Sequence, residues 1–376
     1  MRVLHLVHTP GPGGTETVVE NLIRWQPKSQ IRQAVACPEG HLADRVKNLN
    51  VPVYTVPFDL LKRSSNPLTA MNTPRVFSVL RNIIQEAVDD FSPDIVHSHS
   101  VKATIVARHA LRMYLNAKLI WHLHDFAPLG RFRRLWIAWA ERASDAIAAV
   151  SRDVGETVCP GSSVHVVYNA LETNGCSLTK RRKTLPESDT INGRITIGYL
   201  GRLHKEKGIR VLLTAFRDLC PGVKNTHLLI AGEPPADNMT MRSELESYAK
   251  QLQIDDQVSF MGRVSDTSHF YGTIDVFVLP APREPFGLVI LEALSHGCPV
   301  IACDAGGPRE ILADFKGAIL VKPDDPLSLS EALETMIHDS SFREYAMTHG
   351  QGFVQNTFSP RTQVETIRSL YEELTV

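Results

Sequence analysis

The sequence contains little cysteine: six residues in a chain of 376, none of them in a C-x-x-C pair. The cysteines are Cys37, Cys159, Cys176, Cys220, Cys298 and Cys303. Their spacing matches neither a zinc cluster nor the framework of a disulfide-rich secreted domain. We therefore expect reduced, buried thiols in a reducing compartment.

Long apolar runs and a strong net charge are also missing. No stretch of about 18 apolar residues could cross a membrane. The N-terminal "MRVLHLVHTPGPGG" is broken by Gly and Pro too early for a signal peptide. The formal net charge of −1 provides no overall attraction to nucleic acid or an acidic membrane. With 43% apolar and 22% charged residues, the composition is that of a soluble globular protein, which we expect to be cytoplasmic.

The glycine-rich segment "HTPGPGGTE" lacks two common nucleotide-binding motifs. Counted from Gly11, the sixth position is Glu16, which breaks the G-x-G-x-x-G pattern and disfavours a dinucleotide oxidoreductase. No G-K-[ST] follows either. The segment still resembles a phosphate loop, because glycine backbone can approach an anion before a helix. A plain tight turn is the alternative.

Short apolar runs alternate with helical patterns along most of the chain. We expect strands at 3–8, 33–37, 51–56, 94–99, 118–124, 146–151, 195–201, 227–232, 258–263, 276–280 and 299–303. We expect helices at 15–26, 42–50, 73–91, 102–114, 133–145, 208–220, 240–253, 269–274 and 286–297. This alternation predicts parallel sheets covered by helices on both faces.

A polar, Gly- and Pro-punctuated segment after residue 170 interrupts the alternation. The fold class that we expect is α/β, with two doubly wound Rossmann-like domains facing each other across a cleft. The boundaries are 1–170 for the first domain, 171–193 for the linker and 194–356 for the second domain. A C-terminal helix, at about 357–376, is a candidate to pack back on the first domain.

Three cations follow the first strand of the second domain, in "GRLHKEKG". Arg202, Lys205 and Lys207 repel one another unless solvent or an anion separates them. Ligands of open α/β sheets bind at the carboxyl ends of strands. We therefore favour an anion site over a solvated loop.

Two carboxylates flank the expected start of the helix in "REPFGLVILEAL". If the helix starts near Phe286, the free amides of Gly287 and Leu288 form an anion site. Glu292 lies about 6 Å further along the same face, within reach of a sugar beside that anion. Glu284 would lie on the other side of the anion. The alternative is that Glu292 pairs with a core Arg or Lys.

The segment 283–312, "REPFGLVILEALSHGCPVIACDAGGPREIL", resembles the Glu-x7-Glu signature of retaining GT-B glycosyltransferases of the family-four type. The stretches "GPGGTE", "VVYNALE", "GRLHKEKG", "LLIAGE", "VSFMGRVSD" and "GGPREIL" are similar to the family's motifs in order and spacing. The resemblance covers nearly the whole chain and is densest over 195–312. One departure is Ala170, where many relatives have glycine, which puts a left-handed turn there in question.

The resemblance implies four catalytic candidates. Arg202 and Lys207 would grip the donor diphosphate, and Glu284 would bind the donor sugar. His124, in "WHLHDF", would lie near the transferred sugar. A histidine at a strand end is otherwise often a hydrogen-bonding loop residue.

The resemblance also implies a donor-binding set. It comprises Gly14, Arg263, Val264, Phe286, Gly287, Leu288 and Glu292. In this set Gly14 would approach the phosphates, Arg263 and Val264 would meet the base, and Glu292 would bind the ribose. His97 and His99, in "HSHS", are acceptor-side candidates at another strand end.

The implied activity is retaining transfer of a hexose or N-acetylhexosamine from a nucleotide sugar, by family weight a UDP-sugar. The acceptor would be a hydroxyl of a glycan, lipid-linked or small-molecule substrate in bacterial cell-envelope polysaccharide, lipopolysaccharide or glycoconjugate synthesis. No D-x-D pair occurs, so we expect neither metal nor cofactor. Alternatives are a GT-B epimerase, a phosphorylase-like protein and a non-catalytic nucleotide-sugar-binding partner subunit. Nucleic acid is not an expected partner.

The segment 130–143, "GRFRRLWIAWAERA", interleaves arginines with aromatic and aliphatic residues. It could rest on an anionic bilayer, as a peripheral contact at the inner face of the plasma membrane. The alternative is an ordinary amphipathic helix that keeps its arginines in solvent and packs its aromatics inward.

Overall fold

The computed structural model describes residues 1–8, 13–27, 29–61, 73–111, 117–126, 131–158, 163–173, 195–219, 223, 225–235 and 238–375. Most of the predicted linker at 171–193 and part of the predicted phosphate loop lie outside these ranges. The contacts divide the chain into two units. The first is Met1–Ala170 with Pro360–Val376, and the second is Leu171–Ser359.

The first unit is built on a parallel sheet of seven strands in the order β3-β2-β1-β4-β5-β6-β7. The strands are β1 (Arg2–Leu6), β2 (Arg32–Cys37), β3 (Val53–Thr55), β4 (Ile95–Ser98), β5 (Lys118–Leu123), β6 (Ala146–Ala149) and β7 (Val164–Val166). Its helices are α1 (Gly14–Trp25), α2 (His41–Lys47), η1 (Phe58–Leu61), α4 (Thr73–Phe91), α5 (Val101–Ala110), α6 (Arg131–Ala143), α7 (Arg152–Gly155) and α15 (Pro360–Thr375).

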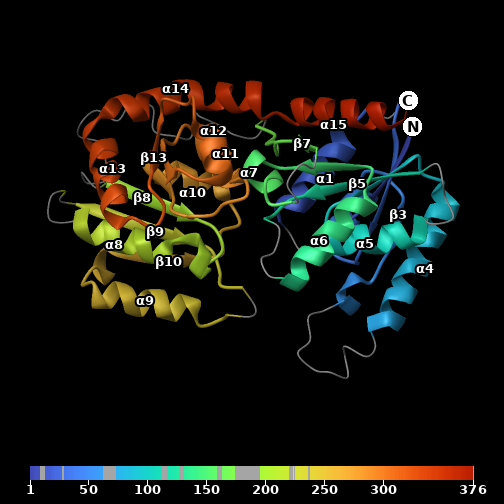
Figure 1. Cartoon of the computed structure of the whole chain (residues 1–376). Helices are drawn as coiled ribbons and strands as arrows, with labels where there is room; N and C mark the ends of the chain where they lie inside the picture. Colours follow the sequence, from blue (N-terminus) through green and yellow to red (C-terminus); the bar gives the residue numbers. More distant parts are fainter. Residues whose placement is uncertain are drawn as a thin grey trace. The chain divides into compact units, whose positions relative to one another are not determined.

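Both faces of this sheet are covered, because alternate residues of β1 point to opposite sides. Val3 packs with α1 and with the C-terminal helix α15, whose Ile367 and Tyr371 are fully buried. Leu4 and Leu6 pack with α4 and α5 on the other side. Figure 1 shows α15 next to α1, so the end of the chain completes the layer started by its first helix.

The second unit has a parallel sheet of six strands in the order β10-β9-β8-β11-β12-β13. The strands are β8 (Ile195–Leu200), β9 (Thr226–Ala231), β10 (Val258–Gly262), β11 (Val276–Leu279), β12 (Val300–Cys303) and β13 (Ala318–Val321). Its helices are η4 (Lys205–Lys207), α8 (Ile209–Leu219), α9 (Met241–Gln251), η5 (Asp255–Gln257), α10 (Thr267–Thr273), α11 (Leu288–Ser295), α12 (Gly306–Leu312), α13 (Pro326–His338) and α14 (Ser340–Thr357).

Both sheets have the strand order of the doubly wound nucleotide-binding fold, as predicted. The order reverses between β1 and β4 in the first sheet and between β8 and β11 in the second. Open sheets of this type bind ligands outside the carboxyl ends of the strands at such a point. No helix among the described residues is long and apolar enough to span a bilayer.

Candidate functional site

Two close backbone approaches assemble the loops at the carboxyl end of the second sheet. Gly208 has a left-handed φ of +69°, and a Cβ there would lie 1.9 Å from the carbonyl oxygen of Pro280. A Cβ on Gly307 would lie 2.3 Å from the backbone of Phe286. The Gly307 amide also donates a 3.0 Å hydrogen bond to the Glu284 carbonyl. The loops after β8, β11 and β12 therefore meet only because glycine stands at both positions.

An ion pair joins the two loops of the switch point. The Nζ of Lys207, after β8, lies 2.6 Å from the Oε2 of Glu284, after β11. The two side chains are only 18% and 14% exposed. We had expected them in separate roles around an anion, and neither their contact nor its shielding was predicted.

The predicted cluster of three cations is divided in the structure. Lys207 turns toward Glu284, whereas Arg202 and Lys205 are exposed. Arg202 remains near the pair, since its charge and that of Glu284 both act on the buried phenol of Tyr199. Burial and then Glu284 raise the pKa of Tyr199, and Arg202 opposes this. The Tyr199 hydroxyl also donates a 3.0 Å hydrogen bond to the Arg202 carbonyl.

Helix α11 begins beside this ion pair, at Leu288 rather than at the predicted Phe286. Its N-cap residue is Gly287, with φ +103° and ψ +56°, and no side chain caps it with a hydrogen bond. The Ile290 amide donates to the Gly287 carbonyl at 2.9 Å, so the amides before it start the helix without a partner in its own ladder. A helix start of this kind favours negative charge.

Glu292 lies one turn further along α11 and is partly exposed. The hydroxyl of Tyr271, on α10, donates a 3.0 Å hydrogen bond to its Oε2. Burial raises the pKa of Glu292, and the Tyr271 hydrogen bond partly offsets this. Among the described residues no Arg or Lys pairs with Glu292, so the alternative of a core ion pair is wrong. The sequence offered no signal for Tyr271.

Arg263 and Val264 follow β10, at the edge of the same sheet, and Arg263 is exposed. The Gly232 amide donates a 2.7 Å hydrogen bond to the Gly262 carbonyl, which joins the ends of β9 and β10. The two candidates thus lie at the carboxyl end of the sheet, two strands away from β8.

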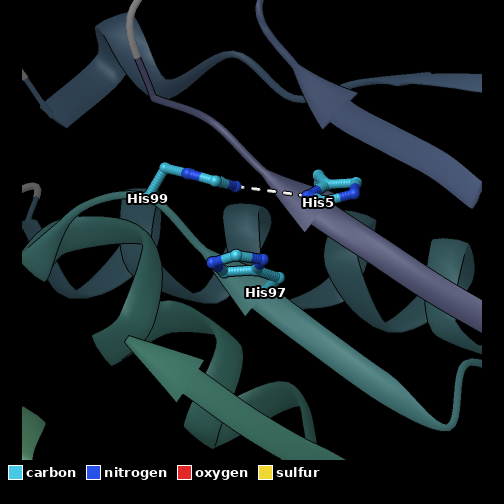
Figure 2. A group of neighbouring side chains, drawn as sticks. All are labelled: His5, His97 and His99. Carbon is cyan, nitrogen blue, oxygen red and sulfur yellow. Dashed lines mark hydrogen bonds between the residues drawn. The ribbon is translucent and has the colours of Figure 1, made fainter. Parts of the chain in front are cut away.

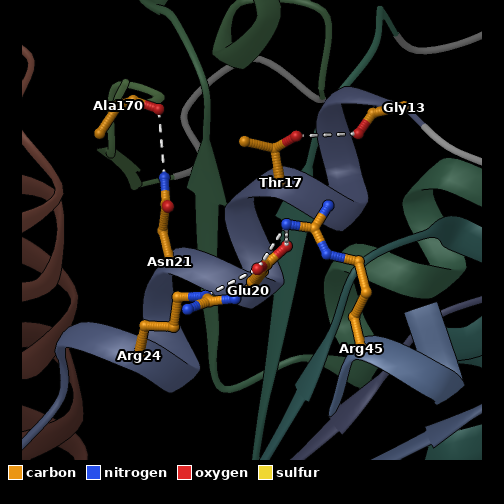
Figure 3. Close-up of polar contacts among 7 residues, drawn as sticks. All are labelled: Gly13, Thr17, Glu20, Asn21, Arg24, Arg45 and Ala170. Atoms are coloured by element: carbon orange, nitrogen blue, oxygen red, sulfur yellow. Dashed lines mark hydrogen bonds and ion pairs between the residues drawn. The ribbon is translucent and has the colours of Figure 1, made fainter. Parts of the chain in front are cut away.

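In the first unit, Gly14 is the first residue of α1, after the extended N-cap Gly13. This helix is held along its length by polar contacts (Figure 3). Glu20 accepts hydrogen bonds from Arg24 at 2.7 Å and Arg45 at 2.6 Å. The Asn21 side chain donates to the Ala170 carbonyl at 3.1 Å. Ala170 is not among the residues with positive φ, so the left-handed turn of its relatives is absent here.

The three predicted histidines of the first unit belong to a larger buried cluster. His97 is in β4, and His99 and His124 follow β4 and β5. Two histidines that we did not predict join them: His5 in β1 and His122 in β5. Figure 2 shows His5, His97 and His99 gathered at neighbouring strands. The repeated H-x-H spacing in "HSH" and "HLH" was the available signal, since residues two apart share one face of a strand.

Burial lowers the pKa of every member of this cluster. The pKa falls to about 4 for His5 and to about 3 for His124. For His97, His99 and His122 it falls well below the ordinary value, with neighbouring histidines adding to the effect of burial. All five imidazoles are therefore neutral at pH 7.

Comparison with known proteins matches both units to glycosyltransferase families. Residues 12–174 match the family described as Glycosyltransferase Family 4, and residues 181–353 match Glycosyl transferases group 1. The capsular polysaccharide biosynthesis glycosyltransferase CapM of Staphylococcus aureus is 30% identical over 56% of this chain and 53% of its own length. The lipopolysaccharide core biosynthesis glycosyltransferase LpsD of Rhizobium meliloti is 24% identical over 99% and 98%.

The chain spans about half the length of several curated relatives that it matches, at 56%, 53% and 48%. Among solved structures, HepE of Anabaena in complex with UDP and glucose is similar over 99% of both chains, with a TM-score of 0.81 and 21% identity. That likeness and the two parallel sheets show the GT-B fold. The two family matches together cover most of the chain, and they show that it belongs to the glycosyltransferases of the family-four type.

Proposed function

We propose that this protein is a retaining hexosyltransferase. It takes a hexose or N-acetylhexosamine from a nucleotide sugar, a UDP-sugar in our proposal, and passes it to a hydroxyl group. The acceptor is a glycan, a lipid-linked sugar or a small molecule of bacterial cell-envelope polysaccharide or glycoconjugate synthesis. The observation that carries the proposal is the shielded ion pair of Lys207 and Glu284 at the switch point, beside the uncapped start of α11.

The ion pair and the helix start suit a diphosphate. An ammonium group has three N–H donors, so Lys207 can keep Glu284 and still donate to a phosphate oxygen. Arg202 adds a second cation, and the amides of Gly287 and Leu288 add neutral donors.

Carboxylates on either side of the diphosphate suit its two sugars. Glu292 has one hydrogen-bond partner among the described residues, Tyr271, which leaves acceptor capacity for adjacent ribose hydroxyls. Glu284 is in our proposal the ligand of the donor sugar. Its pairing with Lys207 keeps the carboxylate ionised next to the phosphate.

In the proposed reaction, the bond between the anomeric carbon and the phosphate oxygen breaks, and a bond to the acceptor oxygen forms on the same face. The acceptor proton passes to the leaving phosphate oxygen, so no further base is required. Negative charge grows on that oxygen in the transition state, where fixed cations are most effective. Arg202 and Lys207 would perform this task without a metal ion or cofactor.

The relatives support this choice of substrates. HepE was solved with UDP and glucose, and CapM and LpsD are named for capsular polysaccharide and lipopolysaccharide core synthesis. We propose a UDP-sugar donor and an envelope glycan acceptor for this chain on that basis.

We also propose that α6 makes a peripheral contact with the cytoplasmic face of the membrane, where a lipid-linked acceptor would be. Leu135 and Trp136 are 68% and 57% exposed, next to the exposed Arg134. Inward packing, the alternative, applies to Ile137 and Ala140, which are buried. Exposed apolar side chains beside a cation suit the interface of an anionic bilayer.

A thermal-shift screen of UDP-, GDP-, ADP- and CDP-sugars tests the proposed donor. We expect the UDP-sugars to raise the melting temperature most, by mass action. NMR of the product formed from the best donor would then give the anomeric configuration. Absence of any shift with all four classes would contradict the function, and an inverted product would contradict retention.

A further inference from the structure

A continuous chain of hydrogen bonds runs through the buried histidines of the first unit. The Oε1 of Gln33, in β2, lies 3.0 Å from the Nε2 of His5. The Nδ1 of His5 lies 3.2 Å from the Nε2 of His99, and the Nδ1 of His99 lies 2.9 Å from the Nε2 of His124. This chain crosses from β2 to β5 and ends at His124, which we expect beside the transferred sugar.

The first residue of the chain determines the direction of every hydrogen bond in it. The Gln33 Nε2 donates to the Ile23 carbonyl at 3.4 Å, which turns Oε1 toward His5. An amide oxygen only accepts, so His5 carries its proton on Nε2 and accepts on Nδ1. A neutral imidazole has one donor and one acceptor nitrogen. Hence His99 and then His124 carry their protons on Nε2 as well.

The last nitrogen of the chain is therefore a lone pair. The Nδ1 of His124 is buried and has no hydrogen-bond partner among the described residues. A buried acceptor without a partner is costly unless a ligand supplies a donor. A hydroxyl group is the simplest ligand that would do so.

The cluster is less suited to a metal ion. His5, His97 and His99 form one group whose ring nitrogens lie within 4.8 Å of one another, and His99, His122 and His124 form a second. However, His97 and His99 are stacked at 4.3 Å with planes only 26° apart, and His122 and His124 are 31° apart. Imidazoles that bind one tetrahedral ion direct their planes to a common point.

The chain also has no exit for a proton. It ends at the amide of Gln33, which does not take up a proton near neutral pH, and Gln33 is 8% exposed. The neighbours of His124 are other histidines or cations. His97, His122 and His8 are close, and Lys102 acts on His8. A positive charge on His124 is thus opposed from each side, and the chain fixes a tautomer rather than moving a proton.

We propose that Gln33, His5 and His99 are positioning residues that hold His124 as the neutral Nε2–H tautomer, so that its Nδ1 accepts a hydrogen bond from a sugar hydroxyl. This inference rests on the proposed function for the identity of that hydroxyl. The tautomer itself does not depend on it. The arrangement agrees with a reaction in which the proton goes to the leaving phosphate, because His124 orients the hydroxyl without taking its proton.

Long-range ¹H–¹⁵N NMR of the full-length protein at pH 7 tests the tautomer without any substrate. We expect His5, His99 and His124 all as neutral Nε2–H forms, with each signal assigned by replacing one histidine. A His124 signal of the Nδ1–H or charged form would overturn the proposal. So would a stoichiometric transition metal bound to the purified protein.

A pair of variants tests the chain of influence. Gln33→Met keeps the side-chain volume but removes the amide oxygen, and we expect His124 to become a mixture of tautomers. The matched control is His97→Gln, which alters the second chain, Tyr371–His97–His122, at an equally buried site. It should leave the His124 tautomer unchanged. Retention of a single tautomer in Gln33→Met would overturn the proposal, as would its loss in the control.

Turnover of UDP-glucose links the tautomer to function. If His124 orients a hydroxyl, Gln33→Met should lower kcat about tenfold, the effect of one hydrogen bond, with little change in KM for the donor. Unchanged kcat with a mixed tautomer would overturn the positioning role. A wild-type protein that shows the single tautomer but uses no nucleotide sugar would instead contradict the proposed function alone.

Discussion

The Nζ of Lys207 and the Oε2 of Glu284 lie 2.6 Å apart, although the residues are 77 positions apart in the sequence. Each follows a strand that borders the reversal of the second sheet, β8 and β11. The pair combines a fixed cation with an ionised carboxylate at the edge where such sheets bind nucleotides. Most of the predictions below depend on that combination.

Lys207→Ala should reduce turnover of the nucleotide sugar by about 10²–10³, because one cation at the leaving oxygen is lost. The matched control is Lys205→Ala, two residues earlier in the same loop, since Lys205 is exposed. It should retain nearly full turnover. Steady-state kinetics with UDP-glucose decide the question. Wild-type rates in Lys207→Ala, or equal losses in both variants, would remove Lys207 from the site.

Glu292→Gln should weaken UDP binding about tenfold without lowering stability, because a charged acceptor for the ribose is lost. Burial raises the pKa of Glu292, so the folded state binds its proton more readily than the unfolded state. Stability from this group therefore falls as the pH rises through that window. At pH 7 the substitution removes an unfavourable buried charge, and the melting temperature should stay level or rise.

Calorimetric titration with UDP and a thermal melt provide the two measurements for Glu292. Glu331→Gln, on the exposed side of α13, is the control and should change neither. A large drop in melting temperature with unchanged UDP affinity would show that Glu292 is structural.

Acidification should destabilise the first unit. The pKa of His5 is lowered from 6.5 to about 4, and those of His97, His99 and His122 are lowered as well. The unfolded chain takes up protons below pH 6.5 that the folded chain refuses, so the free energy of unfolding falls between pH 6.5 and about 4. Each histidine contributes about 1.4 kcal/mol per pH unit within its window.

Urea melts at a series of pH values measure this slope. His5→Gln should reduce it by the contribution of one proton, whereas His338→Gln, at an exposed position of α13, should not. A free energy of unfolding that is flat from pH 7 to 5 would show that the histidines are not buried in neutral form.

Gly208→Ala should destabilise the second unit by more than about 1 kcal/mol, from its left-handed backbone and the clash with Pro280. Gly272→Ala is the matched control. It lies in α10, and nothing is within 4 Å of the added Cβ. It should be neutral or slightly stabilising. Thermal melts of both variants are sufficient, and equal melting temperatures would mean that the loops after β8 and β11 are not in close contact.

A chelator should leave transfer largely intact if Arg202 and Lys207 replace a metal at the diphosphate. The measurement is UDP release from UDP-glucose before and after EDTA treatment. A complete loss of activity that Mg²⁺ or Mn²⁺ restores would contradict the metal-free reaction, and would return attention to the buried histidines.

The fold was predictable because its signals are local. The alternation of short apolar runs with helical patterns indicated parallel sheets, and the observed strands from β8 to β12 lie within the predicted runs. Helix α11 starts two residues later than predicted, since Gly287 adopts a left-handed conformation that the helical pattern does not encode. The roles of the candidate residues stay predictions, although the structure gathers Lys207, Glu284 and the α11 start at one edge.

By itself, the sequence determined the sequence of elements, the class of each sheet and the loops that carry charged residues. Period and composition specify these features along the chain, without reference to distant residues. Only the tertiary structure decided that Lys207 faces Glu284, that Tyr271 donates to Glu292, and that His5 continues the chain of histidines. Those contacts depend on strand order, which brings β1 beside β4 and β8 beside β11, and on which face of a strand or helix each side chain occupies.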